Sequence, residues 1–270
     1  MLSDIKTQEL ARKVRIHAVK MVNKGGSSHI GSVLSIVDIL AVLYGKVMQY
    51  RSNDPKWDGR DRFILSKGHA GAGVYAILAE CGFFDIVELD KHYQDGSIFS
   101  GHVSHKGVPG VELSTGSLGH GLPVASGMAL AAKIDKKNHK VFVVMSDGEL
   151  DEGSNWEAFM FAAHHGLNNL IAVIDRNKLQ SMRTTEETLS LEPLRDKLIA
   201  FGWNVIEVDG HDHDELFLAI DGDTKKPKVI IANTIKGKGV SFMENEIAWH
   251  YRTPNGELFD QAMKDLGEKI

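Results

Sequence analysis

The chain has 270 residues, enough for one large α/β domain or two small ones with a buried core. Its composition is 43% hydrophobic and 25% charged, and the formal net charge of −5 provides no basic field for nucleic acid. The longest apolar runs, such as residues 141–145, are far shorter than the ~20 residues of a membrane span.

The N-terminal residues, MLSDIKTQEL, contain no apolar segment typical of a secretory signal. Cys81 is the single cysteine, which excludes an internal disulfide and a cysteine-rich metal site. The sequence therefore predicts a soluble, cytoplasmic protein that binds neither nucleic acid nor a membrane.

The predicted elements alternate between helices and short strands. Helical spacing of apolar residues, with glycine stops, predicts helices at residues 7–23, 35–49, 119–133, 153–165, near 193–201 and from 214. A further helix is expected to follow the segment 66–73 and to run through residue 81. Short apolar runs predict strands at residues 62–65, 141–145, 170–175, 205–208 and 229–235. Residues 95–115 are rich in Gly, Ser and His and are expected to form a long ordered loop, which in a compact domain is usually functional.

This alternation predicts a doubly wound α/β fold with a mostly parallel sheet and helices on both faces. The chain has no internal repeat or proline-rich linker, so we expect a single domain over residues 1–270, in which 236–270 form a C-terminal loop and amphipathic segment. Ligands of such sheets bind beyond the carboxyl ends of the strands, at a switch point in strand order.

Histidine usage is unusual, because thirteen histidines are present and several follow glycine or serine in the first half of the chain. The pairs are Ser28-His29, Gly68-His69, Gly101-His102 and Gly119-His120. Glycine lets the backbone approach a ligand closely, and histidine binds anions or transfers protons near neutral pH. Together these pairs indicate a histidine-lined pocket.

The strongest local signal follows the predicted strand at 141–145, where the sequence reads VFVVMSDGELDEG. Asp147 is followed thirty residues later by Asn177 in LIAVIDRNKLQ, directly after the next buried strand. Carboxylate and amide oxygens suit magnesium or calcium, and such a metal completes its shell with water and phosphate oxygens. Gly148 would let a backbone N–H reach a phosphate, and the helix that follows it would point its positive dipole end toward the site.

This pattern resembles the thiamine-diphosphate fingerprint, an Asp-Gly pair followed about thirty residues later by Asn. The family usually has Gly-Asp-Gly, and Ser146 replaces the first glycine here. The chain resembles the N-terminal section of transketolases over nearly its whole length, through the segments GGSSHIGSVLSIVDIL, LSKGHA, SGHVS, STGSLGHGL and TIKGKGVSFMENEIAWH.

The resemblance implies a role for each matching residue. The divalent metal, Mg²⁺ with Ca²⁺ or Mn²⁺ as alternatives, would be bound by Asp147, Asn177 and the carbonyl of Leu179. Thiamine diphosphate would be held by His69, Gly116, Leu118, Gly148, Glu152, Asn177 and His250. Glu152 would also be buried at a subunit interface. Proton donors and acceptors facing the cofactor and substrate would be His29, His69, His102 and His250.

The implied reaction is that of transketolase, the transfer of a two-carbon ketol unit from a ketose phosphate to an aldose phosphate. In this family a second domain supplies the glutamate that activates the aminopyrimidine, and also the arginines that bind the sugar phosphate. This chain contains no such segment. The resemblance therefore implies a truncated chain or, as our prediction, the N-terminal subunit of a split transketolase that forms an α2β2 assembly with a separate C-terminal subunit.

Other functions remain open. Another thiamine-diphosphate-dependent ketol or acyl transferase could act on an unusual sugar or a 2-oxo acid, although the four histidines favour sugar chemistry. A non-catalytic cofactor-binding module is the alternative outside enzymes. A dehydrogenase motif formed by Gly71, Gly73 and Ala76 with Asp90 is weak, and close packing beside His69 explains these glycines better.

Two further polar segments are given structural roles. His211-Asp212-His213 offers too few clustered ligands for a metal, and a capping turn before a helix is expected there. The segment Lys236-Gly237-Lys238 lacks the spacing of a phosphate-binding loop, so we expect a solvated or mobile loop near the pocket.

Overall fold

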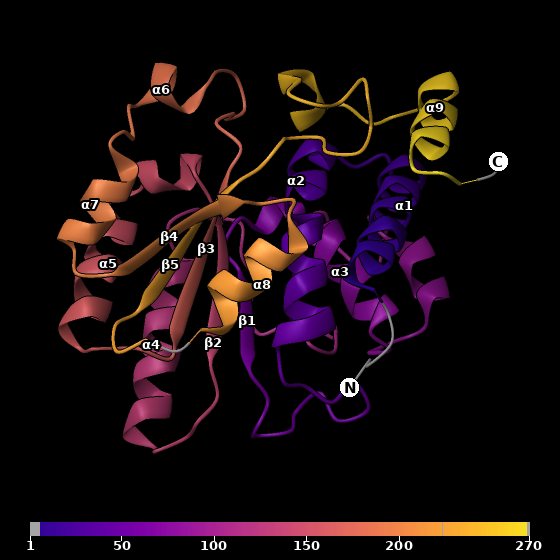
Figure 1. Cartoon of the computed structure of the whole chain (residues 1–270). Helices are drawn as coiled ribbons and strands as arrows, with labels where there is room; N and C mark the ends of the chain where they lie inside the picture. Colours follow the sequence, from indigo (N-terminus) through magenta and orange to yellow (C-terminus); the bar gives the residue numbers. More distant parts are fainter. Residues whose placement is uncertain (1–5, 223, 269–270) are drawn as a thin grey trace.

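A computed structural model describes residues 6–222 and 224–268 of the chain, so the predicted domain's residues 1–5, 223 and 269–270 lie outside the described residues. Within that part, five parallel strands form one sheet in the order β1-β2-β3-β5-β4 (Figure 1). The strands are β1 (Arg62–Leu65), β2 (Val141–Ser146), β3 (Leu170–Arg176), β4 (Asn204–Asp209) and β5 (Lys228–Asn233). The predicted α/β fold is confirmed.

Helices cover both faces of the sheet (Figure 1). The α-helices are α1 (Thr7–Gly25), α2 (Ile30–Val42), α3 (Gly71–Glu80), α4 (Gly121–Ile134), α5 (Gly153–His164), α6 (Thr185–Thr188), α7 (Leu194–Ala200), α8 (His213–Asp221) and α9 (Glu257–Asp265). The 3₁₀ segments are η2 (Gly68–Ala70), η3 (Ile86–Lys91), η4 (Gly148–Asp151) and η5 (Ile247–His250), and η1 (Leu43–Val47) is a π-helical turn that extends α2.

The strands are apolar because both faces of the sheet are buried. Along a strand, successive side chains point to opposite faces. Phe142 and Val144 of β2 therefore join the core formed with α1, α2, α3 and α8, whereas Val143 and Met145 join the core formed with α4, α5 and α7. Both sides of β2 and β3 are covered, which is why each reads as an unbroken apolar run.

Helix α2 runs through the core, and all of its residues are buried. The window Ile30–Val47 is long and apolar enough to cross a membrane, but 83% of it is buried inside the protein, as in the core helix of a folded domain. The helix begins at Ile30 rather than at residue 35, because packing of its first turn outweighs the low helix propensity of Gly31 and Ser32.

The predicted long loop contains no helix or strand between residues 95 and 115, yet it is tied to the sheet. The Val103 N–H donates to the Gly68 carbonyl at 2.9 Å, and the Thr115 hydroxyl donates to the Leu65 carbonyl at 2.5 Å. A Cβ atom at Gly68 would collide with the Thr115 carbonyl, and one at Gly121 would collide with the Ser66 hydroxyl. The loop and the exit of β1 therefore fit together with no room for side chains.

The register of β2 and β3 brings the segments that follow these two strands together at their carboxyl ends. Ser146 at the end of β2 is in register with Asp175 of β3, so the residues that follow both strands emerge together. The chain then continues to the edge strand β4 and returns to β5, which lies between β3 and β4. This reversal is the kind of switch point beside which parallel α/β sheets bind ligands.

The core faces can be tested by truncating one buried side chain. Phe142→Ala should lower the free energy of unfolding by about 3–5 kcal/mol, because it leaves a cavity between β2 and the α1–α3 layer. Leu218→Ala, at a position that is 72% exposed, should change it by less than about 0.5 kcal/mol. Urea unfolding followed by circular dichroism measures both, and similar effects for the two variants would contradict this packing.

Candidate functional site

Four histidines from distant parts of the sequence meet above the carboxyl ends of the strands. Relative to the ring centroid of His29, those of His250, His69 and His102 lie at 4.9, 5.2 and 5.6 Å. His29 caps α2, His69 follows β1 in η2, His102 lies in the long loop, and His250 ends η5. We call these four residues the histidine cluster, and they are the four histidines that the sequence singled out.

His29 is held in an unusual backbone conformation, with a φ angle of 72°. Its N–H donates to the His250 carbonyl at 2.9 Å, and its ring Nδ1 lies 2.7 Å from the Ser28 hydroxyl. A left-handed conformation is uncommon outside glycine, asparagine and aspartate, and it persists only where surrounding contacts enforce it. Here the contacts fix the ring at the centre of the cluster.

The cluster is electrically neutral near pH 7. Burial, with repulsion from His102 and Lys236, lowers the pKa of His29 to about 4. Burial and repulsion from Lys236 lower the pKa of His250 to about 3, and burial also lowers the pKa of His69 and His102. A neutral imidazole has one donor and one acceptor nitrogen, so such a ring can donate to a hydroxyl or carbonyl oxygen and can accept from a hydroxyl.

Asp147 and Asn177 lie beside each other at the ends of β2 and β3. The Asp147 carboxylate is 1% exposed; its Oδ2 accepts from the Lys178 N–H at 2.6 Å and from Arg176 at 3.2 Å. Asn177 donates to Asp175 at 2.9 Å, and its own Oδ1 accepts from the Leu179 N–H at 3.1 Å. The segment that follows Asn177 therefore folds over the Asp147 carboxylate.

The environment of Asp147 suits a cation. Burial and the nearby Asp175 raise the pKa of Asp147 to about 6, which shows that its negative charge is only partly compensated by the protein. The carbonyl oxygens of Leu179 and Gln180 both point at a positive group, the Lys236 ammonium, at 3.0 Å. Carboxylate, amide and carbonyl oxygens in one place are the ligand set of magnesium or calcium.

The metal ligands are too few for a site built from protein alone. No group of three or more His, Cys, Asp or Glu side chains with metal-binding geometry occurs among residues 6–222 and 224–268. Asp147, Asn177 and the Leu179 carbonyl would therefore need oxygens from a second ligand, as magnesium sites that bridge to phosphates do. The residues present fit that arrangement.

Two buried lysines belong to the site and were missed from the sequence. Lys67 is 1% exposed and forms an ion pair with Asp175 at 2.5 Å. Lys236 is also 1% exposed, and its Nζ lies 3.1 Å from Nδ1 of His250. The prediction of a solvated loop at Lys236 is wrong, because contacts with Leu179 and His250 draw this side chain inward. Burial, with repulsion from Lys67, lowers the pKa of Lys236 to about 8.

Asp175 is the carboxylate at the centre of these charges. It is 0% exposed and accepts from Lys67, from Ser35 at 2.7 Å, from Asn177 and from Thr234. Although burial opposes ionisation, Lys67 and the hydroxyl donors hold the pKa of Asp175 below its usual value. The site thus combines two buried ammonium groups with two buried carboxylates, those of Asp147 and Asp175.

The remaining predicted residues lie near this centre. A Cβ atom at Gly116 would be 3.3 Å from the His102 ring, and one at Gly119 would be 2.6 Å from Cβ of Glu152. Leu118, between those glycines, is partly buried, whereas Glu152 is exposed in this chain. The loop that carries Gly116 and Leu118 therefore lies between His102 and Glu152.

Glu149 is a further residue that the sequence reasoning missed. Its side chain is 0% exposed and accepts from the Gly119 N–H at 2.9 Å and from Ser66. It thereby joins the loop at 116–119 to the turn after β2. Gly148 itself opens only the short η4 segment, and its N–H bonds Asp147 at 2.8 Å. The α-helix that follows, α5, begins at Gly153, as the sequence predicts.

The capping turn predicted at residues 211–213 is confirmed, and the weak dehydrogenase motif has a structural role. Asp212 caps α8 by accepting from the N–H groups of Asp214 and Glu215, both at 2.9 Å. A Cβ atom at Gly71 would lie 2.6 Å from the Val103 nitrogen, so this glycine serves close packing rather than dinucleotide binding. Asp90 lies in η3 with its side chain 64% exposed, far from the end of any strand that could carry a nucleotide.

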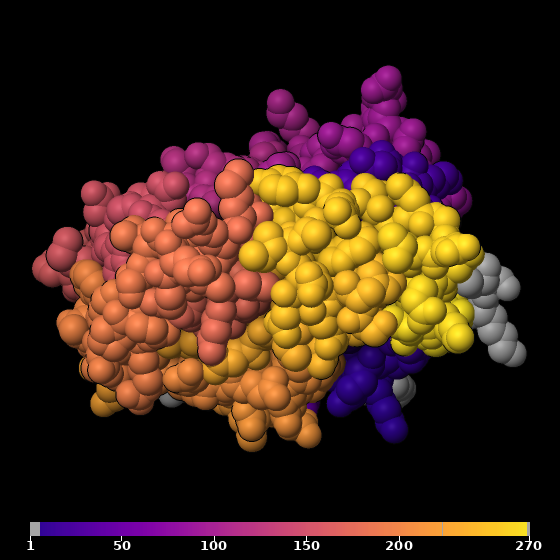
Figure 2. All heavy atoms as spheres, turned by 90° about the horizontal axis from the view of Figure 1, so that it is seen from above, coloured from indigo at the N-terminus to yellow at the C-terminus, as the bar shows by residue number. Residues whose placement is uncertain are grey.

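Two segments lie next to each other over the carboxyl ends of the strands. Figure 2 shows the C-terminal residues, in yellow, beside the segment around α6, in salmon. The Lys236 side chain joins them, since its Nζ reaches the Leu179 and Gln180 carbonyls from the C-terminal side. The site is therefore assembled from both halves of the chain.

The neutral state of His29 leads to a testable dependence of stability on pH. Its pKa is about 4 in the folded chain and ~6.5 when unfolded, so its contribution is complete above ~6.5 and is lost progressively as the pH falls from there through about 4. Between pH 7 and 5 the parent should lose roughly 1 kcal/mol more stability than His29→Asn, which tolerates the left-handed backbone.

Urea unfolding at the two pH values, without ligands, measures this difference. The groups facing His29 are His69, His102, His250, Lys67 and Lys236, and they stay unchanged in the variant. His120→Asn, at an exposed histidine outside the cluster, is the control and should keep the parental pH dependence. Equal pH dependence in parent and His29→Asn would contradict a neutral, buried His29.

Comparison with known proteins identifies the family to which this fold belongs. The family model described as "Transketolase, thiamine diphosphate binding domain" matches residues 6–267. The transketolase structure from Campylobacter jejuni superimposes with a TM-score of 0.92 at 32% identity, and covers 97% of this chain and 43% of that enzyme. Human transketolase is 37% identical over 264 residues, which are 97% of this chain and 42% of the human protein.

Relatives of similar length are named as separate subunits. The chain is 44% identical to an apulose-4-phosphate transketolase subunit of Phocaeicola vulgatus, covering 98% of this chain and 96% of that protein. It is 41% identical to the 6-deoxy-6-sulfo-D-fructose transketolase subunit SqwG of a Clostridium species, with 97% and 96% covered. The chain thus spans less than half of full-length transketolases and nearly all of these subunits. It belongs to the transketolase family, and residues 6–267 are its thiamine diphosphate-binding domain.

Proposed function

We propose that this chain is the N-terminal subunit of a split transketolase. It binds the diphosphate of thiamine diphosphate through a divalent metal, Mg²⁺ or alternatively Ca²⁺ or Mn²⁺, and acts with a separate C-terminal subunit. The complex transfers a two-carbon ketol unit from a ketose to an aldose phosphate. The observation that carries this proposal is the meeting of the histidine cluster with Asp147, Asn177 and two buried lysines at the switch point of the sheet.

The charges of the site support binding of a diphosphate. Lys67 and Lys236 are both buried, and the partners described for them are mainly one carboxylate and several backbone carbonyls. A metal held by Asp147, Asn177 and the Leu179 carbonyl would add positive charge beside them. Buried charges are stable when they are paired, so an anionic group with several oxygens complements this arrangement.

The histidines support chemistry on a hydroxylated substrate. When bound, thiamine diphosphate supplies the electron sink for the two-carbon unit. His69 and His250, with Gly148, would hold the diphosphate, while Gly116, Leu118 and Glu152 would contact the rest of the cofactor. His29, His102 and His250, neutral at pH 7, would donate protons to or accept protons from the substrate's hydroxyl and carbonyl oxygens.

The names of relatives that this chain covers almost completely support a partner, since two of them are named as transketolase subunits. Full-length transketolases are more than twice as long as the region matched here, whereas the subunit relatives have nearly the length of this chain. Glu152 is exposed beside the loop at 116–119, where a second subunit could bury it. We therefore propose an α2β2 assembly in the cytoplasm, in which residues 1–270 form one diphosphate-binding domain.

The relatives also bear on the substrate. Two of them are named for apulose 4-phosphate and for 6-deoxy-6-sulfo-D-fructose, which differ from the common pentose and hexose phosphates. The proposed donor is accordingly a ketose carrying an anionic group. Sugars outside the pentose phosphate pathway are the first to test.

The proposed function can be tested by reconstitution. The chain should be co-purified with the product of the neighbouring gene and supplied with thiamine diphosphate and Mg²⁺. Ketol transfer should appear only with both subunits, because this chain holds one side of the cofactor. Apulose 4-phosphate, sulfofructose, xylulose 5-phosphate and fructose 6-phosphate are the donors to compare. Full transketolase activity of the isolated chain would contradict the split-subunit proposal.

The metal assignment can be tested with Asp147→Ala. In the complex, this change should weaken Mg²⁺-dependent binding of thiamine diphosphate at least about 100-fold, because it removes the charged metal ligand. Titration calorimetry at fixed Mg²⁺ measures the affinity. Asp54→Ala, at an exposed aspartate, is the control and should bind as the parent does. Unchanged affinity in a folded Asp147→Ala complex would refute the assignment.

A further inference from the structure

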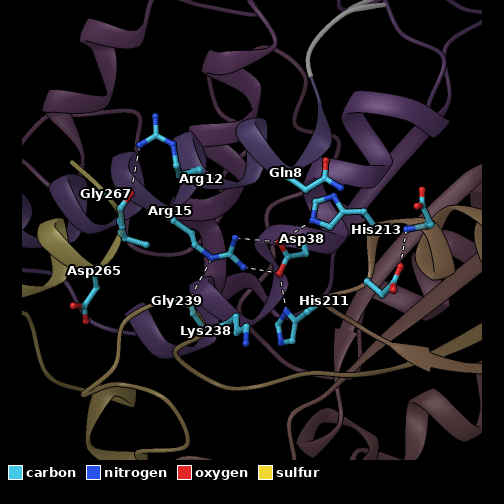
Figure 3. Close-up of a pocket in the computed structure, with 13 residues that line it drawn as sticks. Gln8, Arg12, Arg15, Asp38, His211, His213, Lys238, Gly239, Asp265 and Gly267 are labelled. Carbon is cyan, nitrogen blue, oxygen red and sulfur yellow. Dashed lines mark hydrogen bonds and ion pairs between the residues drawn. The ribbon is translucent and has the colours of Figure 1, made fainter. Parts of the chain in front are cut away.

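A buried aspartate on α2 gathers three cationic or polar side chains beside a surface cavity of about 660 Å³ (Figure 3). Asp38 is 5% exposed and accepts from the Arg15 guanidinium at 3.0 and 2.5 Å. His211 Nδ1 lies 2.6 Å from Oδ2 of Asp38, and His213 Nε2 lies 3.0 Å from Oδ1. We call Arg15, Asp38, His211 and His213 the Asp38 network, and none of them belongs to the histidine cluster.

His211 uses both ring nitrogens. Its Nε2 accepts from the Ile235 N–H at 2.8 Å, so this nitrogen carries no proton. Its Nδ1 therefore carries the proton and donates it to Asp38. The ring is a neutral connector in a fixed tautomer, held by Asp38 on one side and holding the backbone of Ile235 on the other.

Ile235 directly precedes Lys236, and the same short segment is anchored further along. Nε of Arg15 donates to the Lys238 carbonyl at 3.1 Å, and the Gly237 N–H donates to the Gly31 carbonyl at 2.9 Å. His211 and Arg15, both bound to Asp38, thus hold the backbone on the two sides of Lys236. The Lys236 side chain then reaches away from the network to the Leu179 and Gln180 carbonyls and to His250.

Several charged side chains that line the cavity are already paired. Arg15 and Asp38 are paired with each other, Arg12 is paired with Glu9, and Asp265 accepts from Ser241. The cavity exposes one side of the Asp38 network. The other side of the network contacts the backbone of residues 235–238.

We propose that His211 is a positioning residue of the cofactor site. It fixes the Ile235 amide, and so places the Lys236 ammonium where the diphosphate is bound, while Asp38 and Arg15 fix His211 itself. The proposal rests on the function proposed above, because it is there that a diphosphate lies beside Lys236. A residue that supports a binding group from outside the site typically affects affinity about 10–100-fold when it is lost.

Three variants separate the two bonds of His211. His211→Asn retains an amide that can donate to Asp38 but is too short to reach Ile235. His211→Gln places an acceptor oxygen near the position of Nε2 and can still bind the Ile235 N–H. His213→Asn is the matched control, because it loses a bond to the same aspartate without any described contact to residues 235–238.

The variants are compared in the complex with the partner subunit. His211→Asn should weaken binding of thiamine diphosphate about 10–100-fold, leave kcat at saturating cofactor within about twofold, and speed hydrogen exchange of the Ile235 amide. His211→Gln should bind within about threefold of the parent and keep the amide protected, which is rescue by the variant that retains the bond to Ile235. His213→Asn should leave both the affinity and the exchange at Ile235 unchanged.

Parental affinity and parental exchange in a folded His211→Asn complex would overturn the proposal, and so would equal losses in His211→Asn and His213→Asn. If His211→Asn does not fold, His211→Phe replaces it, because it keeps the ring volume and lacks both nitrogens. If the parent complex binds no thiamine diphosphate, the proposed function fails. The exchange of the Ile235 amide, measured without cofactor, still decides whether His211 holds this segment.

Discussion

The buried ion pair between Lys67 and Asp175 is the interaction on which the rest of the site depends. Asp175 is the penultimate residue of strand β3. Its carboxylate also accepts from Thr234, which follows β5, and from Ser35 on α2. A buried carboxylate of this kind is stable only while all of its partners remain in place. The pair therefore fixes the relative positions of three strand ends and the central helix, and the cofactor site is built on that fixed base.

The same charge sets the character of the neighbouring groups. Asp175 contributes to the raised pKa of Asp147, so a cation at Asp147 relieves repulsion between two buried carboxylates. Lys67 in turn contributes to the low pKa of His29, His69 and His250. The proposed cation site and the neutral histidines thus share a cause in burial together with one arrangement of charges, in which each buried group affects the protonation of the next.

The sequence predicts the sheet well, because β2 and β3 are buried on both faces and appear as unbroken apolar runs. It also finds the histidine cluster and the Asp147–Asn177 pair, through glycine pairs and strand ends and through a family resemblance. It misses Lys67 and Lys236, since lysine is rarely buried and its inward direction depends on partners far away in the chain. Such meetings of distant segments are properties of the tertiary structure, and no local pattern encodes them.

The close fit between the exit of β1 and the long loop has a consequence for exchanging specificity between relatives. Gly68 and Gly121 leave no space for a side chain against Thr115 and Ser66. The backbones on either side of these contacts are therefore closely packed and complementary in shape. A loop transplanted from another sugar transferase would fit only if its own backbone followed the same path at both glycines. The loop and the end of β1 can therefore be exchanged between relatives as one block more readily than residue by residue.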